Sequence, residues 1–195
     1  YAGKAMSLYY LGRREEAAEP WETALKLIDR MSEREKLRTM GSYYAGPARN
    51  YDKAIDEYKL LVTKYPADSA GHNNLAVAYF SKLDFANALT HGERARQIYP
   101  RSYKYRANYA LYAMYAGQFD TAVTEANAAL EIDKTALKAL VARGLSELAL
   151  GKNAEAMKTY EEFSKVSAAA ASFASAGKAD MAIVEGRFDD AIGIL

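Results

Sequence analysis

The chain has 195 residues, is 50% hydrophobic and 26% charged, contains no cysteine and carries a formal net charge of +1. This composition is typical of an ordered, helix-rich protein and excludes a linker or a disordered segment. The balanced charge argues against nucleic-acid binding, and the lack of cysteine excludes disulfides, thiolate nucleophiles and cysteine-based zinc sites. No apolar run is long enough to span a bilayer, so we expect no membrane contact by this segment. The compartment stays undecided, with the cytoplasm favoured.

Both ends of the chain lie in stretches with helical, apolar periodicity, beginning at Tyr1 and ending at 191–195. Complete repeat arrays cover their terminal helices with polar faces. We therefore expect this chain to be a piece of a longer protein.

The clearest element lies between Pro66 and Pro100. Two apolar-periodic segments, 75–80 and 85–98, are separated by a short break at 82–84. This pattern predicts a helix–turn–helix unit that ends where proline cannot continue the second helix. A unit this small cannot bury its apolar faces alone, which predicts that it recurs.

The recurrence is visible as a small residue followed, twelve positions later, by alanine. The six pairs are Ala5 and Ala17, Ser42 and Ala54, Ala76 and Ala88, Ala110 and Ala122, Gly144 and Ala156, and Ala179 and Ala191. Small side chains are needed where the two helices of a hairpin cross closely. Glycine marks the turn between the helices at Gly12, Gly117, Gly151 and Gly186, where it tolerates a positive φ.

Three departures from the pattern carry structural expectations. Ser32 and Glu35 form a capping box after three extra residues, so the following helix should start about one turn early. Gly46-Pro47 should end that helix early and lengthen the next turn. The segment 167–177 is made almost entirely of small residues, so its helix should bury little area per residue.

These residues resemble the tetratricopeptide repeat family. The resemblance is carried in one repeat by Leu75, Ala76, Tyr79, Ala88, Ala95 and Pro100, and in the next by Tyr109, Ala110, Gly117, Phe119, Ala122 and Ala129. It implies an all-α, right-handed superhelix of six helical hairpins and about twelve helices, forming one array with a concave groove. The repeats lie near 1–31, 35–68, 69–102, 103–136, 137–170 and 172–195.

In this family the first helix of each hairpin lines the groove and contacts a bound peptide. Carried onto this sequence, the resemblance implies groove positions at Lys36, Thr39, Tyr43, Asn73, Asn74, Val77, Phe80, Lys104, Asn108, Leu111, Met114, Tyr115, Lys138, Val141 and Leu145. An asparagine amide can both donate to and accept from an extended backbone, and the two lysines at 104 and 138 favour an acidic group or a C-terminal carboxylate. The alternative is that the asparagines serve local structure and the lysines are solvated.

Other kinds of site are poorly supported. His72 and His91 have no further histidine or cysteine with which to hold a metal, and the adjacent acid pairs point to solvated helix faces. Relatives that bind chaperone tails use a five-residue carboxylate clamp. Asn74 and Lys104 match it, but Thr39, Tyr43 and Asn108 do not, which argues against that role. We expect no catalytic residue and no cofactor.

The stretch 27–35, together with 43–44, 50–55 and 65–66, is similar to the repeat region of large bacterial signalling proteins. In those proteins a eukaryotic-like serine/threonine kinase or a winged-helix regulator precedes the repeats, but no kinase motif is present here. The sequence predicts a non-catalytic module that binds an extended segment or a helix of another protein. The alternative is self-association through the terminal helices.

Overall fold

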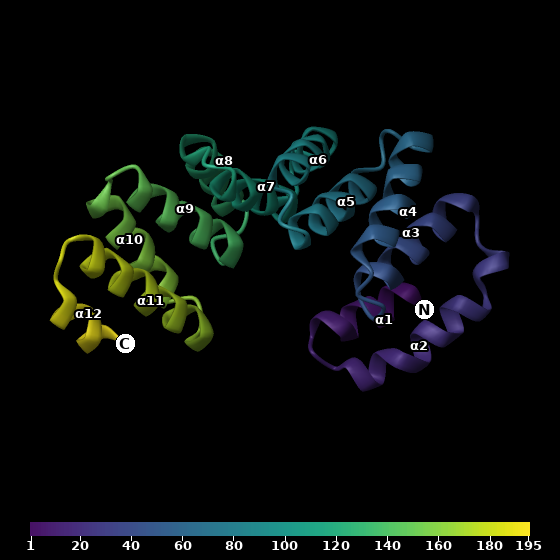
Figure 1. Ribbon diagram of the computed structural model, residues 1–195, viewed down its shortest axis with the longest axis horizontal. Helices are drawn as coiled ribbons and strands as arrows, with labels where there is room; N and C mark the ends of the chain where they lie inside the picture. The colour runs from purple at the N-terminus through teal and green to yellow at the C-terminus, as the bar shows by residue number, and fades with distance from the viewer. The chain divides into compact units, whose positions relative to one another are not determined.

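The computed structural model describes residues 1–195, which form twelve α-helices and one short 3-10 helix (Figure 1). The predicted all-α fold of helical hairpins is confirmed. The helices divide into two compact units, 1–98 and 99–195, and each is described by itself. No helix is both long enough and apolar enough to cross a membrane.

The first unit holds three hairpins. Its elements are α1 (Ala2–Tyr10), α2 (Arg14–Lys26), η1 (Ile28–Arg30), α3 (Glu33–Ala45), α4 (Tyr51–Lys64), α5 (Ser69–Ser81) and α6 (Phe85–Ile98). Within it α1 pairs with α2, α3 with α4 and α5 with α6, and α4 also packs along α5 (Figure 1).

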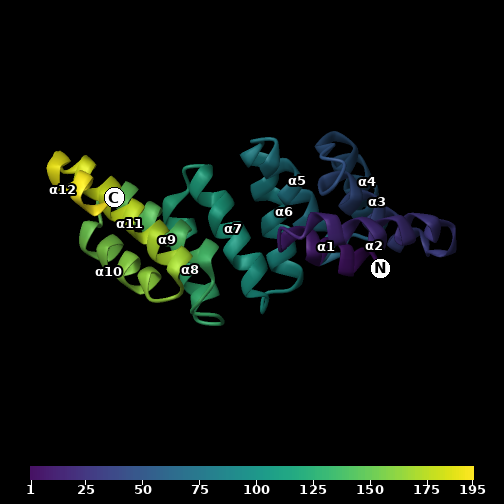
Figure 2. The ribbon, with the colours of Figure 1, turned by 90° about the horizontal axis from the view of Figure 1, so that it is seen from below.

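The second unit also holds three hairpins. Its helices are α7 (Tyr103–Tyr115), α8 (Phe119–Leu130), α9 (Leu137–Ala149), α10 (Asn153–Ser164), α11 (Ala168–Val184) and α12 (Phe188–Ile194). The first helices α7 and α9 pack on each other, and α10 lies beside both α9 and α11 (Figures 1 and 2).

Small residues occupy the places where helices approach each other most closely. The alanines of the six sequence pairs are all buried, at most 4% exposed. A tyrosine ring fills the space next to several glycines: a Cβ on Gly41 would collide with Tyr58, and a Cβ on Gly144 or Gly177 would collide with Tyr160. The repeat pattern therefore reflects a packing requirement that larger side chains would violate.

The turn within each hairpin uses one residue with positive φ. Gly12, Gly117, Gly151 and Gly186 have φ values of 72 to 76°, as predicted. In the other two hairpins the same place is taken by Arg49 (φ 48°) and Leu83 (φ 62°). Arg49 and Leu83 therefore adopt the left-handed backbone conformation, which costs about 1–2 kcal/mol for a residue with a Cβ.

The helix boundaries around the second hairpin follow the predicted signals. Ser32 accepts a hydrogen bond from the Glu35 backbone N–H, and the Glu35 carboxylate accepts one from the Ser32 N–H at 2.9 Å, which completes the capping box. Helix α3 begins at Glu33, before its repeat at 35–68, and ends at Ala45, directly before Gly46-Pro47, and a longer turn follows at 46–50. Helix α11, in the small-residue segment, buries only alanine, glycine and one methionine, Met181.

Candidate protein-binding site

A cleft in the second unit brings together three of the predicted groove residues. Lys104 and Asn108 lie on α7, and Lys138 lies in the first turn of α9, which packs against α7. They line a cleft of about 360 Å³ whose remaining walls are Tyr103, Ala107, Ala136 and Leu137. The cleft thus combines cationic and amide groups with apolar walls.

The two lysines of this cleft differ in their surroundings. The Lys138 ammonium donates a hydrogen bond to Asn108 Oδ1 at 2.7 Å, and desolvation lowers the pKa of Lys138. The Lys104 ammonium lies 5.9 Å from the centre of the Tyr103 ring. Neither lysine forms an ion pair with a carboxylate of the chain. Both can therefore neutralise an acidic group that enters the cleft.

The other predicted residues of this unit lie farther along the same two helices. Leu111, Val141 and Leu145 are half-buried, and Met114 is buried. Tyr115, at the end of α7, is 51% exposed. None of the five lines the cleft that holds the lysines.

In the second repeat, the predicted groove residues make contacts within the chain. Lys36 Nζ donates to Asp29 Oδ1 at 3.0 Å, and buried Thr39 donates its hydroxyl to Met31 Sδ at 3.5 Å. Tyr43 packs edge-on against Trp21, with ring centres 5.7 Å apart. Asp29 and Met31 of the longer connection therefore contact Lys36 and Thr39, and Trp21 of α2 contacts Tyr43.

In the third repeat, the predicted asparagines lie next to a buried tyrosine. Asn73 donates to Asn74 Oδ1 at 3.2 Å, and Asn74 and Val77 line a small cavity of about 80 Å³ beside Tyr58. Burial raises the pKa of Tyr58 to about 12, although hydrogen bonds to Ser42 and Asn74 oppose the shift. Asn74 thereby joins α5 to α4, the second helix of the preceding hairpin.

Phe80, the last predicted position of α5, packs on Phe85 at the start of α6, with ring centres 5.7 Å apart. This contact lies across the turn of the third hairpin.

The two histidines form a stacked pair. His72 Nδ1 and His91 Nδ1 are 3.2 Å apart, His72 Nε2 donates to the Pro66 carbonyl at 3.2 Å, and the His91 ring stacks on Tyr79. Burial lowers the pKa of both histidines. No group of three or more histidine, cysteine or acidic side chains is placed to hold a metal ion.

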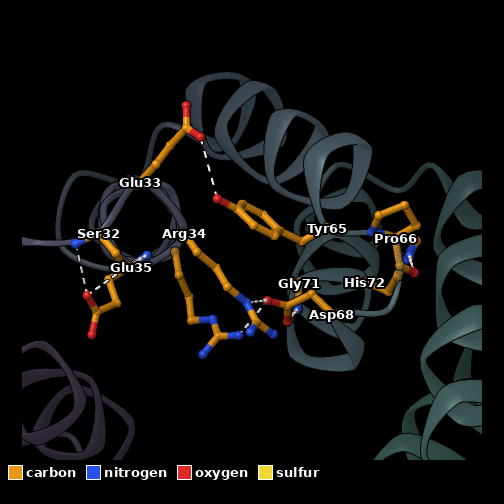
Figure 3. Close-up of polar contacts among 10 residues, drawn as sticks. Ser32, Glu33, Arg34, Glu35, Tyr65, Pro66, Asp68, Gly71 and His72 are labelled. Atoms are coloured by element: carbon orange, nitrogen blue, oxygen red, sulfur yellow. Dashed lines mark hydrogen bonds and ion pairs between the residues drawn. The ribbon is translucent and has the colours of Figure 1, made fainter.

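The sequence reasoning missed a buried carboxylate that joins two repeats. Asp68, 2% exposed, caps α5 by accepting the Gly71 N–H at 2.8 Å. It also accepts Arg34 Nε at 2.8 Å and Arg38 Nη2 at 2.5 Å, both from α3 (Figure 3). Its sequence signal is a pair of arginines four residues apart on one helix face, followed by Asp68 one repeat length (34 residues) after Arg34.

Residues 43–103, 109–165 and 141–195 match the tetratricopeptide repeat family. Serine/threonine-protein phosphatase 5 of Homo sapiens and that of Rattus norvegicus are each 32% identical over 88 residues. The match covers 45% of this chain and 18% of the length of each phosphatase.

Solved structures share the fold at low sequence identity. A crystal structure of MamA is 15% identical with a TM-score of 0.70, covering 80% of this chain and 90% of that one. MamA of Desulfovibrio magneticus RS-1 is 10% identical with a TM-score of 0.71, covering 84% and 92%. YrrB, described as a TPR protein with an unusual peptide-binding site, is 17% identical with a TM-score of 0.62, covering 81% and 80%. These similarities show a repeat-type helical solenoid.

Proposed function

Because the chain belongs to the tetratricopeptide repeat family, we propose that it is a non-catalytic module that binds an acidic segment of a partner protein between α7 and α9. Repeats of this family generally serve as interaction modules rather than as enzymes. The family does not specify the partner, and the kind of partner depends on the side chains that line the site.

The observation that carries the proposal is the Lys138 ammonium, which bonds to a neutral amide and not to a carboxylate of the chain. Asn108 Oδ1 accepts from this ammonium but carries no charge, and the Lys138 side chain stays open to a ligand. A carboxylate in the cleft would supply the missing opposite charge and would also lie within the field of Lys104. The apolar walls, including Leu137, would receive a neighbouring aliphatic side chain.

The surface extends from the cleft along α7 and α9. Half-buried Leu111, Val141 and Leu145 would add apolar contacts, and exposed Tyr115 would add an aromatic ring. Lys36 and Thr39 are already engaged inside the chain, which supports the α7–α9 cleft over the second repeat as the principal contact.

Calorimetric titration of the 195-residue chain with a peptide of alternating leucine and aspartate, acetyl-LDLDLD with a free C-terminus, tests this proposal. Lys104→Gln and Lys138→Gln should each weaken binding by about tenfold, because each removes one charge-assisted contact of roughly 1.4 kcal/mol. Lys158→Gln, the same change at an exposed lysine of α10, should leave the affinity unchanged. Equal affinities for all the variants would overturn the proposal.

We also propose that the module belongs to a bacterial signalling protein. The support is the resemblance of 27–35, 43–44 and 50–55 to the repeat regions of such proteins. The sequence of the complete gene tests it: a kinase or winged-helix domain encoded before the repeats would support the proposal, and any other neighbour would refute it.

A second candidate function is self-association. Helix α12 and the end of α11 present exposed apolar side chains, among them Val184 at 68%, Phe188 at 63% and Ile192 at 75% exposed. Patches of this kind mark contact surfaces on soluble proteins. Light scattering over a range of concentrations tests this candidate, and a mass that stays monomeric throughout would count against it.

A further inference from the structure

The first junction between hairpins is open. Second helices normally pack along the first helix of the next hairpin, as α4 does with α5, α8 with α9, and α10 with α11. Helix α2 does not pack along α3 in this way; it continues into the short helix η1, and α3 then begins with its own capping box. The longer connection thus separates α2 from α3, which touch at the Trp21–Tyr43 ring contact but do not pack along each other as the three pairs above do.

The separation leaves a cleft of about 470 Å³ lined by residues of α1, α2, α3 and the turn at 46–50. Its aromatic lining is Tyr9, Trp21 and Tyr43. Trp21 is 3% exposed, and its buried Nε1–H has no acceptor in the protein. Because this nitrogen is itself enclosed, a ligand in the cleft would meet the indole ring of Trp21 and not its N–H group.

Two arginines at this cleft lack carboxylate partners. Arg14 lies over the Tyr9 ring, 5.5 Å from its centre, and Arg49 extends from the turn. The nearby acid, Glu22, is 4.0 Å from the ammonium of Lys26. The cleft therefore presents two uncompensated guanidinium groups beside an aromatic wall.

We propose that the cleft between α2 and α3 binds a short acidic peptide segment. An aromatic or aliphatic side chain of the peptide lies among the rings, and a carboxylate accepts from Arg14 and Arg49. The volume suits one or two side chains. A nucleic-acid strand fits less well, because Glu22 also lines the cleft and the chain has a net charge of only +1.

This site is separate from the α7–α9 cleft, since all of its residues belong to the first unit. Trp21 is the sole tryptophan of the chain, so a ¹H–¹⁵N spectrum contains a single indole signal and that signal reports on this cleft alone. The probe is acetyl-DLFD-amide, which has neither tryptophan nor tyrosine. Its control is acetyl-NLFN-amide, which keeps the apolar side chains and loses the charge.

The acidic peptide should move the Trp21 indole signal saturably, and the amide control should bind at least tenfold more weakly. The double variant Arg14→Gln/Arg49→Gln should also lose at least tenfold in affinity. Arg13→Gln, the same change at a neighbour that is already paired with Glu16, should bind like the wild type. Lys138→Gln should leave this titration unchanged, which separates the proposal from the one for the α7–α9 cleft.

Three results would overturn the inference. The first is an indole signal that does not move with the acidic peptide. The second is a shift that persists in the Arg14→Gln/Arg49→Gln variant, which would mean that the arginines do not read the charge. The third is an equal or larger shift with an eight-residue oligothymidylate, which would assign the cleft to a polyanion instead.

Discussion

Replacing Asp68 by asparagine tests whether a buried carboxylate holds the second and third repeats together. The Asp68 side chain is 1% exposed and accepts from Arg34 Nε at 2.8 Å and from Arg38 Nη2 at 2.5 Å. Asparagine keeps a carbonyl oxygen for the Gly71 N–H and so preserves the cap of α5. The variant Asp68→Asn therefore removes the charge and replaces Oδ2, the acceptor of both arginines, with an amide NH2 group that cannot accept.

The loss of stability expected for Asp68→Asn depends on how exposed the two arginine side chains are. Hydrogen bonds to charged groups contribute about 1.5–3 kcal/mol each when buried. The side chains of Arg34 and Arg38 are 49% and 40% exposed, so they regain water when their acceptor becomes neutral. We expect Asp68→Asn to lower the free energy of unfolding by about 2 kcal/mol in total. Asp68→Ala should lower it by about 1 kcal/mol more, because alanine also removes the N-cap of α5.

Urea denaturation at neutral pH, followed by the emission of Trp21, measures this loss in the unit that contains Asp68. An Asp68→Asn variant within 0.5 kcal/mol of the wild type (roughly the scatter of neutral surface changes) would refute the reasoning. It would mean that the carboxylate serves only as a helix cap.

The same contact has a predicted pH dependence. Burial alone would raise the pKa of Asp68, but hydrogen bonds from Gly71, Arg34 and Arg38 outweigh it and lower the pKa. The stabilisation is therefore complete above the ordinary carboxyl pKa of about 3.9 and is lost as the pH falls through the lower folded-state pKa. The stabilities of the wild type and Asp68→Asn should converge in acid.

Three further predictions concern packing, turns and the histidine pair. Leu83→Gly should raise the free energy of unfolding by about 0.5–1 kcal/mol, because Leu83 is exposed and has φ 62°. Gly177→Ala should lower it by about 1–3 kcal/mol, because the new Cβ would lie within 2.8 Å of three ring atoms of Tyr160. His72 and His91 have pKa values lowered by burial, so the stability of the first unit should fall as the pH drops below about 6.5, the ordinary histidine pKa. Denaturant midpoints measure all three.

Each of these three predictions has a control variant or a result that would contradict it. Gly3→Ala, in a helix where a Cβ would meet no atom within 4 Å, should not destabilise the chain. A Leu83→Gly variant that loses stability would show that the turn is not strained. A His72→Gln/His91→Gln variant that keeps the full pH dependence between 5 and 7 would assign that dependence to other groups.

Much of the fold could be predicted because its causes are local and periodic. A small residue at each helix crossing, such as Ala76, recurs at the same place in every repeat, and a glycine, such as Gly117, recurs in four of the six turns. Each repeat therefore supports the interpretation of the others. The capping box at Ser32 is equally local, since both partners lie within one turn. Lys104 and Lys138 were each predicted to favour an acidic group, and the structure places both in the lining of one cleft.

The remaining features of the fold and of the sites depend on contacts that occur in one repeat only, so the periodic pattern cannot predict them. The extra residues before α3 predicted an early start of the helix, but not that Asp29 and Met31 would fold back onto Lys36 and Thr39. The open junction beside Trp21 follows from the same connection. Leu83 has no intrinsic preference for a positive φ, and only its alignment with the turn glycines could have indicated one.

The pKa of the Lys138 ammonium, measured by NMR with and without saturating acetyl-LDLDLD, tests the central claim most directly. In the free chain desolvation should hold this pKa below its ordinary value of about 10.4, and the bound carboxylate should raise it, because an opposite charge favours the protonated form. A peptide that binds and leaves the Lys138 pKa unchanged would contradict the account, since the acidic group would then lie elsewhere.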